Sequence, residues 1–160
     1  MFTKVSQLMS QPALVCQVGD SLHETAKLMW DRDCGVLPVV DPAGHVIGMI
    51  TDRDICMALY MQGHPIHAIA VASVMSRTVH ACRPDDSVEA AEKLMRDNQV
   101  RRLPVIDESG HPVGLLSLND LARASAKAGG QERDGLSAAH VASTLAAICA
   151  PHLPAVPPRA

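Results

Sequence analysis

The stretch Leu37-Pro-Val-Val-Asp-Pro-Ala-Gly-His-Val-Ile-Gly-Met-Ile-Thr51 recurs in the chain as Leu103-Pro-Val-Ile-Asp-Glu-Ser-Gly-His-Pro-Val-Gly-Leu-Leu-Ser117. In each copy, two short apolar segments flank the polar sequence Asp-x-x-Gly-His. Short apolar runs separated by Asp and Gly are typical of two strands joined by a tight turn. The sequence therefore predicts one β-hairpin in each copy.

The recurrence extends well beyond the hairpins. Residues 5–60 align with residues 71–126 at a constant offset of 66 without a gap, and 19 of the 56 aligned positions are identical. Two copies suit a pair related by a pseudo-twofold axis, in which each copy covers the apolar face of the other. A solenoid requires at least about three repeats. The sequence thus predicts one module built from two similar units.

Both copies carry the same order of elements. A first strand is predicted at residues 14–17 and again at residues 79–82. A helix follows in each copy, after Ser21 or Ser87, because serine is a favourable helix N-cap. The hairpin comes next, and a second helix begins where it ends, so each unit is β-α-β-β-α, an α/β fold. The hairpin strands are predicted at Val36–Val40, Val46–Thr51, Arg102–Ile106 and Val113–Ser117.

Changes in composition mark the boundaries of the units. A Gly-His-Pro sequence at residues 63–65 separates the copies, which predicts one repeat at residues 3–62 and the other at residues 69–128. Residues 129–160 form a tail with a Pro-rich end. A C-terminal helix is predicted at residues 137–149, since apolar residues recur there at helical spacing. Its apolar stripe consists of Val141, Leu145 and Ile148.

The composition excludes several classes of protein. A net charge of -3 and 2% aromatic residues argue against nucleic-acid binding by phosphate neutralisation or base stacking. No apolar run reaches the roughly 20 residues of a membrane span, and the N-terminus lacks the apolar core of a signal peptide. The five cysteines include no Cys-x-x-Cys, which predicts buried free thiols in a cytoplasmic protein. No Cys/His spacing matches a zinc site, and His45 and His111 are predicted to be exposed in their turns.

Taken together, the repeated features resemble those of the cystathionine-β-synthase (CBS) domain, and the tandem resembles a Bateman module. They are Met-Ser near the start of each copy, Asp-Ser before the first helix, Leu-Pro-Val, and Asp-x-x-Gly-His. The copies end in Thr-Asp-Arg-Asp and Ser-Leu-Asn-Asp, respectively. The resemblance covers about residues 3–126 and leaves the tail uncovered.

This resemblance implies a three-stranded sheet and two helices per repeat, packed sheet on sheet. It implies two clefts between the repeats that hold adenosine compounds such as AMP, ADP, ATP, S-adenosylmethionine or NAD, and assembly of two modules into a homodimer. Members of the family usually regulate an enzyme, channel or transporter. The sequence here predicts a stand-alone module that requires no cofactor.

The resemblance also assigns candidate ligand contacts at the start of the second helix of each copy. An aspartate there accepts hydrogen bonds from ribose hydroxyls. The side-chain hydroxyl three residues before it and, in the first copy, the arginine just before it face phosphate at the helix N-terminus. The second copy has Asn119 in place of the cation. Both motifs also have the form of a capping box, which gives the same residues a purely structural interpretation. The candidates are Thr51, Arg53 and Asp54 in the first copy and Ser117, Asn119 and Asp120 in the second.

In the family, adenine lies between apolar side chains and the backbone just before the proline of the hairpin. Arg101 and Arg102 at this place either face an anionic ligand or form a solvated strand edge. We predict that Arg53 holds phosphate in one cleft and that Arg101 or Arg102 does so in the other. The leucines before each proline have an alternative role as core. The remaining candidates are Val36, Leu37, Pro38, Leu103 and Pro104, with Leu14, Val15, Val79 and His80 from the first strands.

Two functions remain open on the sequence. The first is a regulatory sensor that binds adenine nucleotides and transmits the signal to a partner protein. The second is a dimerisation or docking module whose clefts bind nothing, with the tail helix covering a partner. Catalysis is not predicted, because no nucleophile is paired with a base and no phosphate-binding loop or dinucleotide fingerprint is present.

Overall fold

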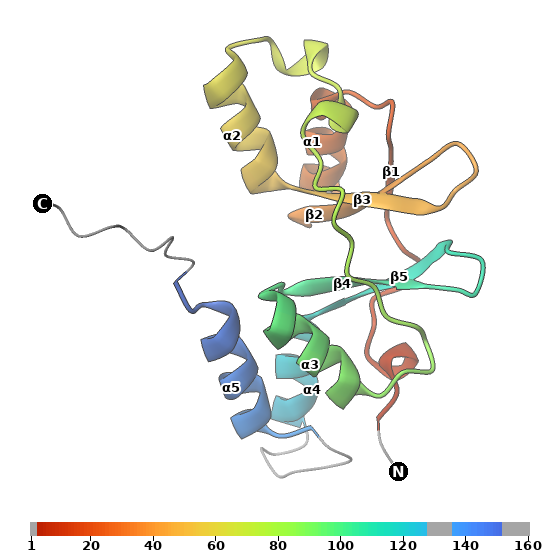
Figure 1. Cartoon of the computed structure of the whole chain (residues 1–160), viewed down its shortest axis with the longest axis vertical. Helices are drawn as coiled ribbons and strands as arrows, with labels where there is room; N and C mark the ends of the chain where they lie inside the picture. Colours follow the sequence, from red (N-terminus) through yellow and green to blue (C-terminus); the bar gives the residue numbers. More distant parts are fainter. Residues whose placement is uncertain (1–2, 128–135, 152–160) are drawn as a thin grey trace, which may run out of the picture.

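The chain folds into two similar halves stacked along its long axis, with the sheets at the junction and the helices outside (Figure 1). The computed structural model describes residues 3–127 and 136–151. The first half contains β1 (Cys16–Gln17), β2 (Val36–Val40), β3 (Val46–Thr51), α1 (Leu22–Asp31) and α2 (Asp52–Gln62). The second half contains β4 (Arg102–Ile106), β5 (Pro112–Ser117), α3 (Val88–Asn98), α4 (Leu118–Lys127) and α5 (Ala138–Ile148). Short 3₁₀ helices lie at η1 (Val5–Gln7), η2 (Ile66–Ala68) and η3 (Val71–Ser73).

Both predicted hairpins form. Strand β2 pairs antiparallel with β3, and β4 pairs antiparallel with β5, in equivalent registers. Strand β1 adds to the first sheet in parallel with β2. The mixed α/β fold with a helix after each strand pair is therefore confirmed.

The predicted first strand of the second copy is wrong. In the first half, Val18 N–H donates to the Val40 carbonyl and extends the pairing of β1. The equivalent residue of the second copy is Pro84, which has no N–H to donate. The pairing there is reduced to a single parallel bridge between Cys82 and Val105, so the second sheet consists of β4 and β5.

The helix starts follow the predicted capping chemistry. The Ser21 side chain accepts a hydrogen bond from Glu24 N–H at 3.3 Å, and the Glu24 carboxylate accepts one from Ser21 N–H, which completes a capping box. Ser87 accepts from Ala90 N–H at 3.1 Å in the same way. These contacts satisfy backbone donors that a helix start otherwise leaves free.

Each half is completed by the segment that precedes the other copy in the sequence. Val5 is fully buried in the core of the second half, and Val71 is fully buried in the core of the first. Isolated bridges confirm the exchange, since Ser10 pairs with Leu115 and Ser76 pairs with Met49. The two aliphatic cores are therefore joined by crossing segments rather than by the junction alone.

Two glycines permit these segments to approach the strands. A side chain at Gly48 would lie 2.8 Å from the Ser76 carbonyl oxygen, and one at Gly114 would lie 2.9 Å from that of Ser10. Carbon and backbone oxygen atoms do not come this close without displacement of the chain. The recurrence of glycine at this place in both copies thus has a steric cause.

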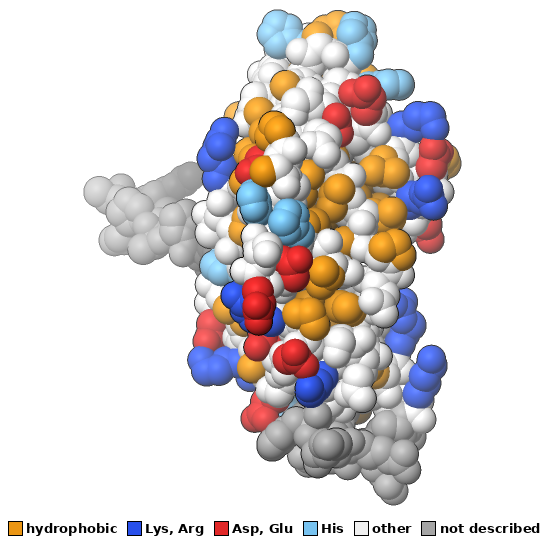
Figure 2. All heavy atoms as spheres, turned by 90° about the vertical axis from the view of Figure 1, so that its right-hand side faces the viewer, with side chains coloured by type: hydrophobic (Ala, Val, Ile, Leu, Met, Phe, Trp, Pro, Cys, Tyr) orange, Lys and Arg blue, Asp and Glu red, His pale blue; other side chains and the backbone are white. Residues whose placement is uncertain are grey.

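The tips of the two hairpins meet on one side of the junction. The His45 and His111 rings stack with their centroids 4.9 Å apart, and Val46 N–H donates to the Gly110 carbonyl at 3.1 Å. Figure 2 shows histidine side chains side by side on this face. The prediction of exposed turn histidines is therefore only partly confirmed: the side chains are 45% and 43% exposed, because each turn covers part of the other.

The predicted tail helix is confirmed as α5, and it packs across α3 and α4 of the second half. Ile148 and Thr144 of α5 are buried there. The Pro-rich end beyond residue 151 lies outside the described residues. Within the part of the chain that the structure covers, none of the helices is long and apolar enough to cross a membrane. All five cysteines are free, and burial raises the pKa of Cys16 to about 11 and that of Cys82 to about 12.

Candidate functional site

The first candidate site lies where β3 ends and α2 begins. Thr51 is the N-cap of α2, and its hydroxyl accepts from Asp54 N–H at 3.1 Å. Asp54 Oδ2 accepts in return from Thr51 N–H at 2.8 Å and from the Thr51 hydroxyl at 2.7 Å. The predicted capping box is therefore present, and it fixes the Asp54 side chain at the helix start.

The second candidate site repeats this arrangement at the start of α4. Asp120 Oδ2 accepts from Ser117 N–H at 2.8 Å and from the Ser117 hydroxyl at 2.5 Å. The Asp120 side chain is 6% exposed and forms an ion pair with Arg123 through its other oxygen, Oδ1. The two aspartates thus share a capping role but differ in what their second oxygen contacts.

The capping bonds occupy only one of the two carboxylate oxygens of Asp54. Both of its capping bonds go to Oδ2, and the structure records no protein partner for Oδ1 among the described residues. The side chain is half-buried, with Arg53 exposed beside it on the first turn of α2. A helix N-terminus with a free carboxylate oxygen and an adjacent cation can contact both a diol and an anion.

The crossing segments bring predicted ligand residues of each copy beside a hairpin strand of the other. Ser76 pairs antiparallel with Met49 of β3, and Val79 and His80 follow it, both half-buried. Ser10 pairs antiparallel with Leu115 of β5, and Leu14 and Val15 follow it, both half-buried. Figure 1 shows the segment after η3 crossing the junction from the first half to the second.

Arg102 also acts across the junction. Burial raises the pKa of the Cys34 thiol, and the Arg102 guanidinium offsets part of this increase. Cys34 belongs to the first half, so the positive charge of Arg102, on β4 of the second half, acts across the junction. Arg101 is exposed, and its carbonyl accepts from Leu118 N–H at 2.9 Å.

The residues around the two hairpin prolines are mainly core. Leu37 and Leu103 are fully buried, as the alternative interpretation of these leucines predicted. Val36, Pro38 and Pro104 are buried as well. Their side chains therefore support the sheets, and a ligand at this place meets chiefly their backbone.

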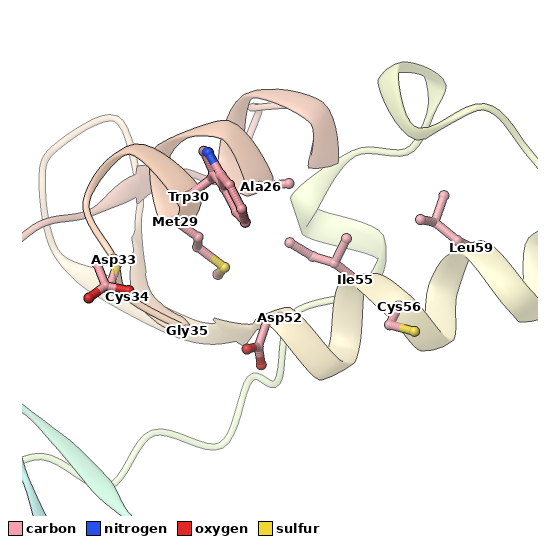
Figure 3. Close-up of a pocket in the computed structure, with 10 residues that line it drawn as sticks. All are labelled: Ala26, Met29, Trp30, Asp33, Cys34, Gly35, Asp52, Ile55, Cys56 and Leu59. Atoms are coloured by element: carbon pink, nitrogen blue, oxygen red, sulfur yellow. The ribbon is translucent and has the colours of Figure 1, made fainter. Parts of the chain in front are cut away.

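The described residues line two recesses of different kinds. A cavity of about 280 Å³ adjoins the second site, between η1 and α4. A groove of about 490 Å³ separates α1 from α2 on the outside of the first half, and Figure 3 shows Trp30 and Ile55 pointing into it from the two helices. The cavity is lined by Gln7, Leu8, Ser10, Asp120, Arg123, Ala124 and Lys127.

Sequence reasoning missed the cations of the second site. Arg123 follows Asp120 by three residues on a helix, a spacing that places two side chains on one face, so the pattern carried a usable signal. Lys127 lies one turn further along the same face. Among residues 3–127 and 136–151, no three His, Cys, Asp or Glu side chains come together as a metal site.

Comparison with known proteins agrees with the repeat pattern. The sequence model of the CBS domain family matches residues 5–61 and 71–127. The CBS domain-containing protein YhcV of Bacillus subtilis is 35% identical over 120 residues, which span 75% of this chain and 84% of YhcV. Homoserine O-acetyltransferase of Methanohalobium evestigatum is 27% identical over 121 residues, which span 76% of this chain and 24% of that protein.

The fold matches solved structures of CBS domain pairs. The CBS domain pair of protein MJ0100, solved in complex with 5′-methylthioadenosine and S-adenosyl-L-methionine, superimposes with a TM-score of 0.73 and 26% identity. The match covers 80% of this chain and 99% of that one. The two matched repeats, their sheet-on-sheet arrangement and the capped helix starts lead to one conclusion: this chain belongs to the CBS domain family, as a tandem pair.

Proposed function

We propose that this protein is a regulatory module that binds an adenosine-containing ligand at the junction of its two CBS repeats and transmits its presence to a partner protein. The observation that carries the proposal is Asp54, a carboxylate fixed at a helix start whose Oδ1 has no partner among the described residues. The MJ0100 pair, which was crystallised with two adenosyl compounds, supports the ligand class. AMP, ADP and ATP are the first ligands to test, followed by NAD and S-adenosylmethionine.

The site chemistry suits such a ligand. The ribose hydroxyls donate to Asp54 Oδ1, and the phosphates meet the N-terminal N–H groups of α2 and the Arg53 guanidinium. The adenine lies against the backbone that precedes Pro38 and Pro104. The scarcity of aromatic residues means that the base packs against aliphatic groups rather than a stacked ring.

Calorimetric titration of the full chain with AMP, ADP, ATP, NAD, S-adenosylmethionine and 5′-methylthioadenosine tests the proposal. Saturable binding of at least one of them is expected, together with a rise in melting temperature, because a ligand that binds only the folded state stabilises it. Flat titrations and unchanged melting curves with all six compounds would contradict the proposal.

A regulatory rather than catalytic role is supported by the relatives. In the homoserine O-acetyltransferase of Methanohalobium evestigatum, the matching segment is 24% of a longer protein. A pair of this kind attached to an enzyme is placed to control it. We expect the present chain to act in the cytoplasm on a separate partner.

We further propose that the chain forms a homodimer through the groove between α1 and α2. On the second half, the equivalent face is covered by α5, which is held by Arg96 Nη1 donating to Thr144 at 2.9 Å and by Gln99 donating to the Ala147 carbonyl at 3.0 Å. The positions equivalent to Arg96 and Gln99 in the first half are Trp30 and Asp33, so α5 of another chain finds neither contact there.

A second copy of the first half fits this groove better. Trp30 is 87% and Tyr60 is 83% exposed beside it, and a twofold interface places the same patch on both chains. The indole of one chain then fills the groove of the other, where an aromatic side chain buries about 150–250 Å².

Light scattering of the purified protein tests this interface. The wild type is expected at twice the 17.0 kDa chain mass, and Trp30→Glu at the single-chain mass with a cooperative melting transition that shows it is folded. Leu145→Glu, at a 46% exposed position of α5, is the matched control and is expected to remain dimeric. A monomeric wild type, or a dimeric Trp30→Glu variant, would contradict the interface.

A further inference from the structure

The face beneath α5 is polar at places where the equivalent face of the first half is apolar. Trp30 and Leu59 line the open groove of the first half (Figure 3). At the same places the second half has Arg96 and Ser125, and Glu92 stands where the first half has an alanine. Because Leu59 lines the groove, the equivalent Ser125 faces the space that α5 fills. Glu92 is 1% and Ser125 is 3% exposed, so α5 covers polar groups as well as apolar ones.

These covered polar groups are only partly bonded. The Thr144 hydroxyl of α5 donates to Glu92 Oε1 at 3.3 Å and accepts from Arg96 Nη1 at 2.9 Å. The guanidinium thus bonds to the threonine, and the structure records no ion pair between it and Glu92. The Ser125 hydroxyl has no hydrogen-bond partner in the part of the chain that the structure describes. A carboxyl and a hydroxyl that lose water without full replacement by protein bonds make the covered state less favourable.

Other contacts hold α5 in place. Leu136, just before the helix, and Ile148 are 5% and 6% exposed and belong to the core of the second half. Gln99 Nε2 donates to the Ala147 and Ala150 carbonyls at 3.0 and 3.2 Å, which satisfies acceptors that a helix end otherwise leaves free. The docked helix is thus a balance between these contacts and the unfavourable burial of polar groups. A segment in such a balance can open locally while the rest of the protein stays folded.

We propose that α5 is a releasable cap, which detaches from α3 and α4 while both hairpins stay folded, and that its release is coupled to the loss of a proton from Glu92. Docking encloses the Glu92 carboxyl with one hydroxyl as its hydrogen-bonded neighbour, and an enclosed carboxyl of this kind favours the neutral form. In the released state water reaches the carboxyl, which then ionises like an ordinary glutamate. Release requires neither a bound ligand nor a second chain.

The charges around Glu92 set the direction of this coupling. Burial raises the pKa of Glu92, and the negative charge of Glu89 on α3 adds to the increase. Three groups oppose it, which are the Thr144 hydroxyl and the charges of Arg96 on α3 and His140 on α5. The described residues of α4 add no charged group to this set. The docked state therefore binds the proton more tightly, so docking is strongest below the ordinary glutamate pKa of about 4.3 and weakens as pH rises through the raised value.

Amide hydrogen exchange of the full chain, followed by mass spectrometry of its peptides, tests the release. After correction for intrinsic rates, the amides of α5 are expected to exchange at least roughly 10-fold faster than those of β4 and β5, because α5 opens without global unfolding. Gly114→Ala, which strains β5 away from α5, is expected to speed exchange of the strands and leave that of α5 unchanged. Equal protection of α5 and the strands, or equal acceleration of both in Gly114→Ala, would overturn the proposal.

Ser125→Ala tests whether the covered polar groups weaken docking. Removal of a buried hydroxyl that lacks a partner is expected to slow the exchange of α5 by roughly 5- to 100-fold. Ser143→Ala, at an exposed position of α5, is the matched control and is expected to change the exchange of α5 by less than about threefold. Unchanged or faster exchange of α5 in Ser125→Ala would overturn the polar origin of the release.

The same measurement at about pH 5 and about pH 8 tests the coupling to Glu92. In the wild type, the opening of α5 is expected to increase with pH beyond the change in intrinsic exchange rates. Glu92→Gln, which cannot ionise, is expected to lose this increase, whereas His140→Gln is expected to retain it. The same increase in Glu92→Gln, or its loss in His140→Gln, would overturn the coupling. Melting curves of every variant establish that it is folded.

Discussion

The outer face of the second half is covered by α5, whereas the same face of the first half is an open groove. Both faces are built from equivalent helices of one repeated sequence, so the difference arises at a few positions. Glu92, Arg96 and Gln99 hold α5 on the second half, and Ala26, Trp30 and Asp33 stand at the same positions of the first. The two copies therefore share the same fold and differ in whether a further helix covers their outer helix pair.

The ligand sites show the same division. Asp120 of the second half is paired within its own helix, whereas Oδ1 of Asp54 in the first half has no partner in the part of the chain that the structure describes. In both comparisons the second half is closed by its own side chains and the first is available to a partner. Repeat 1 is therefore the half through which we expect ligand and second chain to act.

The largest effect is expected from breaking the cover of the second half. Ile148→Ala removes a 94% buried side chain of α5 and is expected to cost about 2–4 kcal/mol of unfolding free energy. Urea denaturation measures it. Leu145→Ala on the same helix, at a 46% exposed position, is expected to cost far less. Equal losses in the two variants would show that α5 is not packed as described.

The crossing segments provide a test in which both halves respond alike. Gly48→Ala and Gly114→Ala each force a methyl group against a backbone carbonyl and are expected to cost about 1–3 kcal/mol. Gly19→Ala is the control, because nothing lies within 4 Å of its added methyl group. A neutral effect at either crossing position would contradict the exchange of segments between the halves.

The buried carboxylate under α5 gives the second half a pH dependence that the first half lacks. Burial raises the pKa of Glu92, while the Thr144 hydroxyl bond and the Arg96 charge oppose the increase. The folded state therefore binds the proton more tightly than the unfolded one, and stability falls as pH rises above the ordinary glutamate pKa of about 4.3. In urea titrations between about pH 4 and 7, Glu92→Gln is expected to remove this fall in the free energy of unfolding. The same fall with pH in the variant would contradict a role for the Glu92 carboxyl.

The smallest effect is expected where the two halves meet symmetrically. Backbone hydrogen bonds, foremost that from His111 N–H, lower the pKa of Asp107, and His45 N–H does the same for Asp41. A lowered folded-state pKa gives stability above the ordinary aspartate pKa of about 3.9 that is lost as pH falls through the lower value. Asp41→Asn and Asp107→Asn are expected to reduce the loss of stability at acid pH by similar amounts. Strongly unequal effects would show that the hairpins are not equivalent.

Much of the fold followed from local sequence. The hairpins and the capped helix starts were predicted correctly, because turn residues and capping serines act within a few positions. The strand at residues 79–82 was predicted by analogy with the first copy, and Pro84 removed the donor that would extend it. The stacking of His45 on His111 depends on contacts between distant segments, which spacing alone does not reveal.

The site was predictable in its residues but not in its arrangement. Thr51 and Asp54 followed from the family motif, and the structure adds that their capping bonds leave one oxygen free. The sequence assigns Arg101 or Arg102 to the cleft that Arg53 does not serve, and this stays a prediction, because the effect of Arg102 across the junction depends on how the two sheets face each other. Arg123 was visible at a spacing of three from Asp120 and was overlooked.

The most direct test of the central claim is a crystal structure of the full chain grown with AMP. The account predicts AMP at the junction of the two repeats, with its ribose hydroxyls on Asp54 and its phosphate at the N-terminus of α2 beside Arg53. A structure grown with AMP whose junction holds no nucleotide would contradict it.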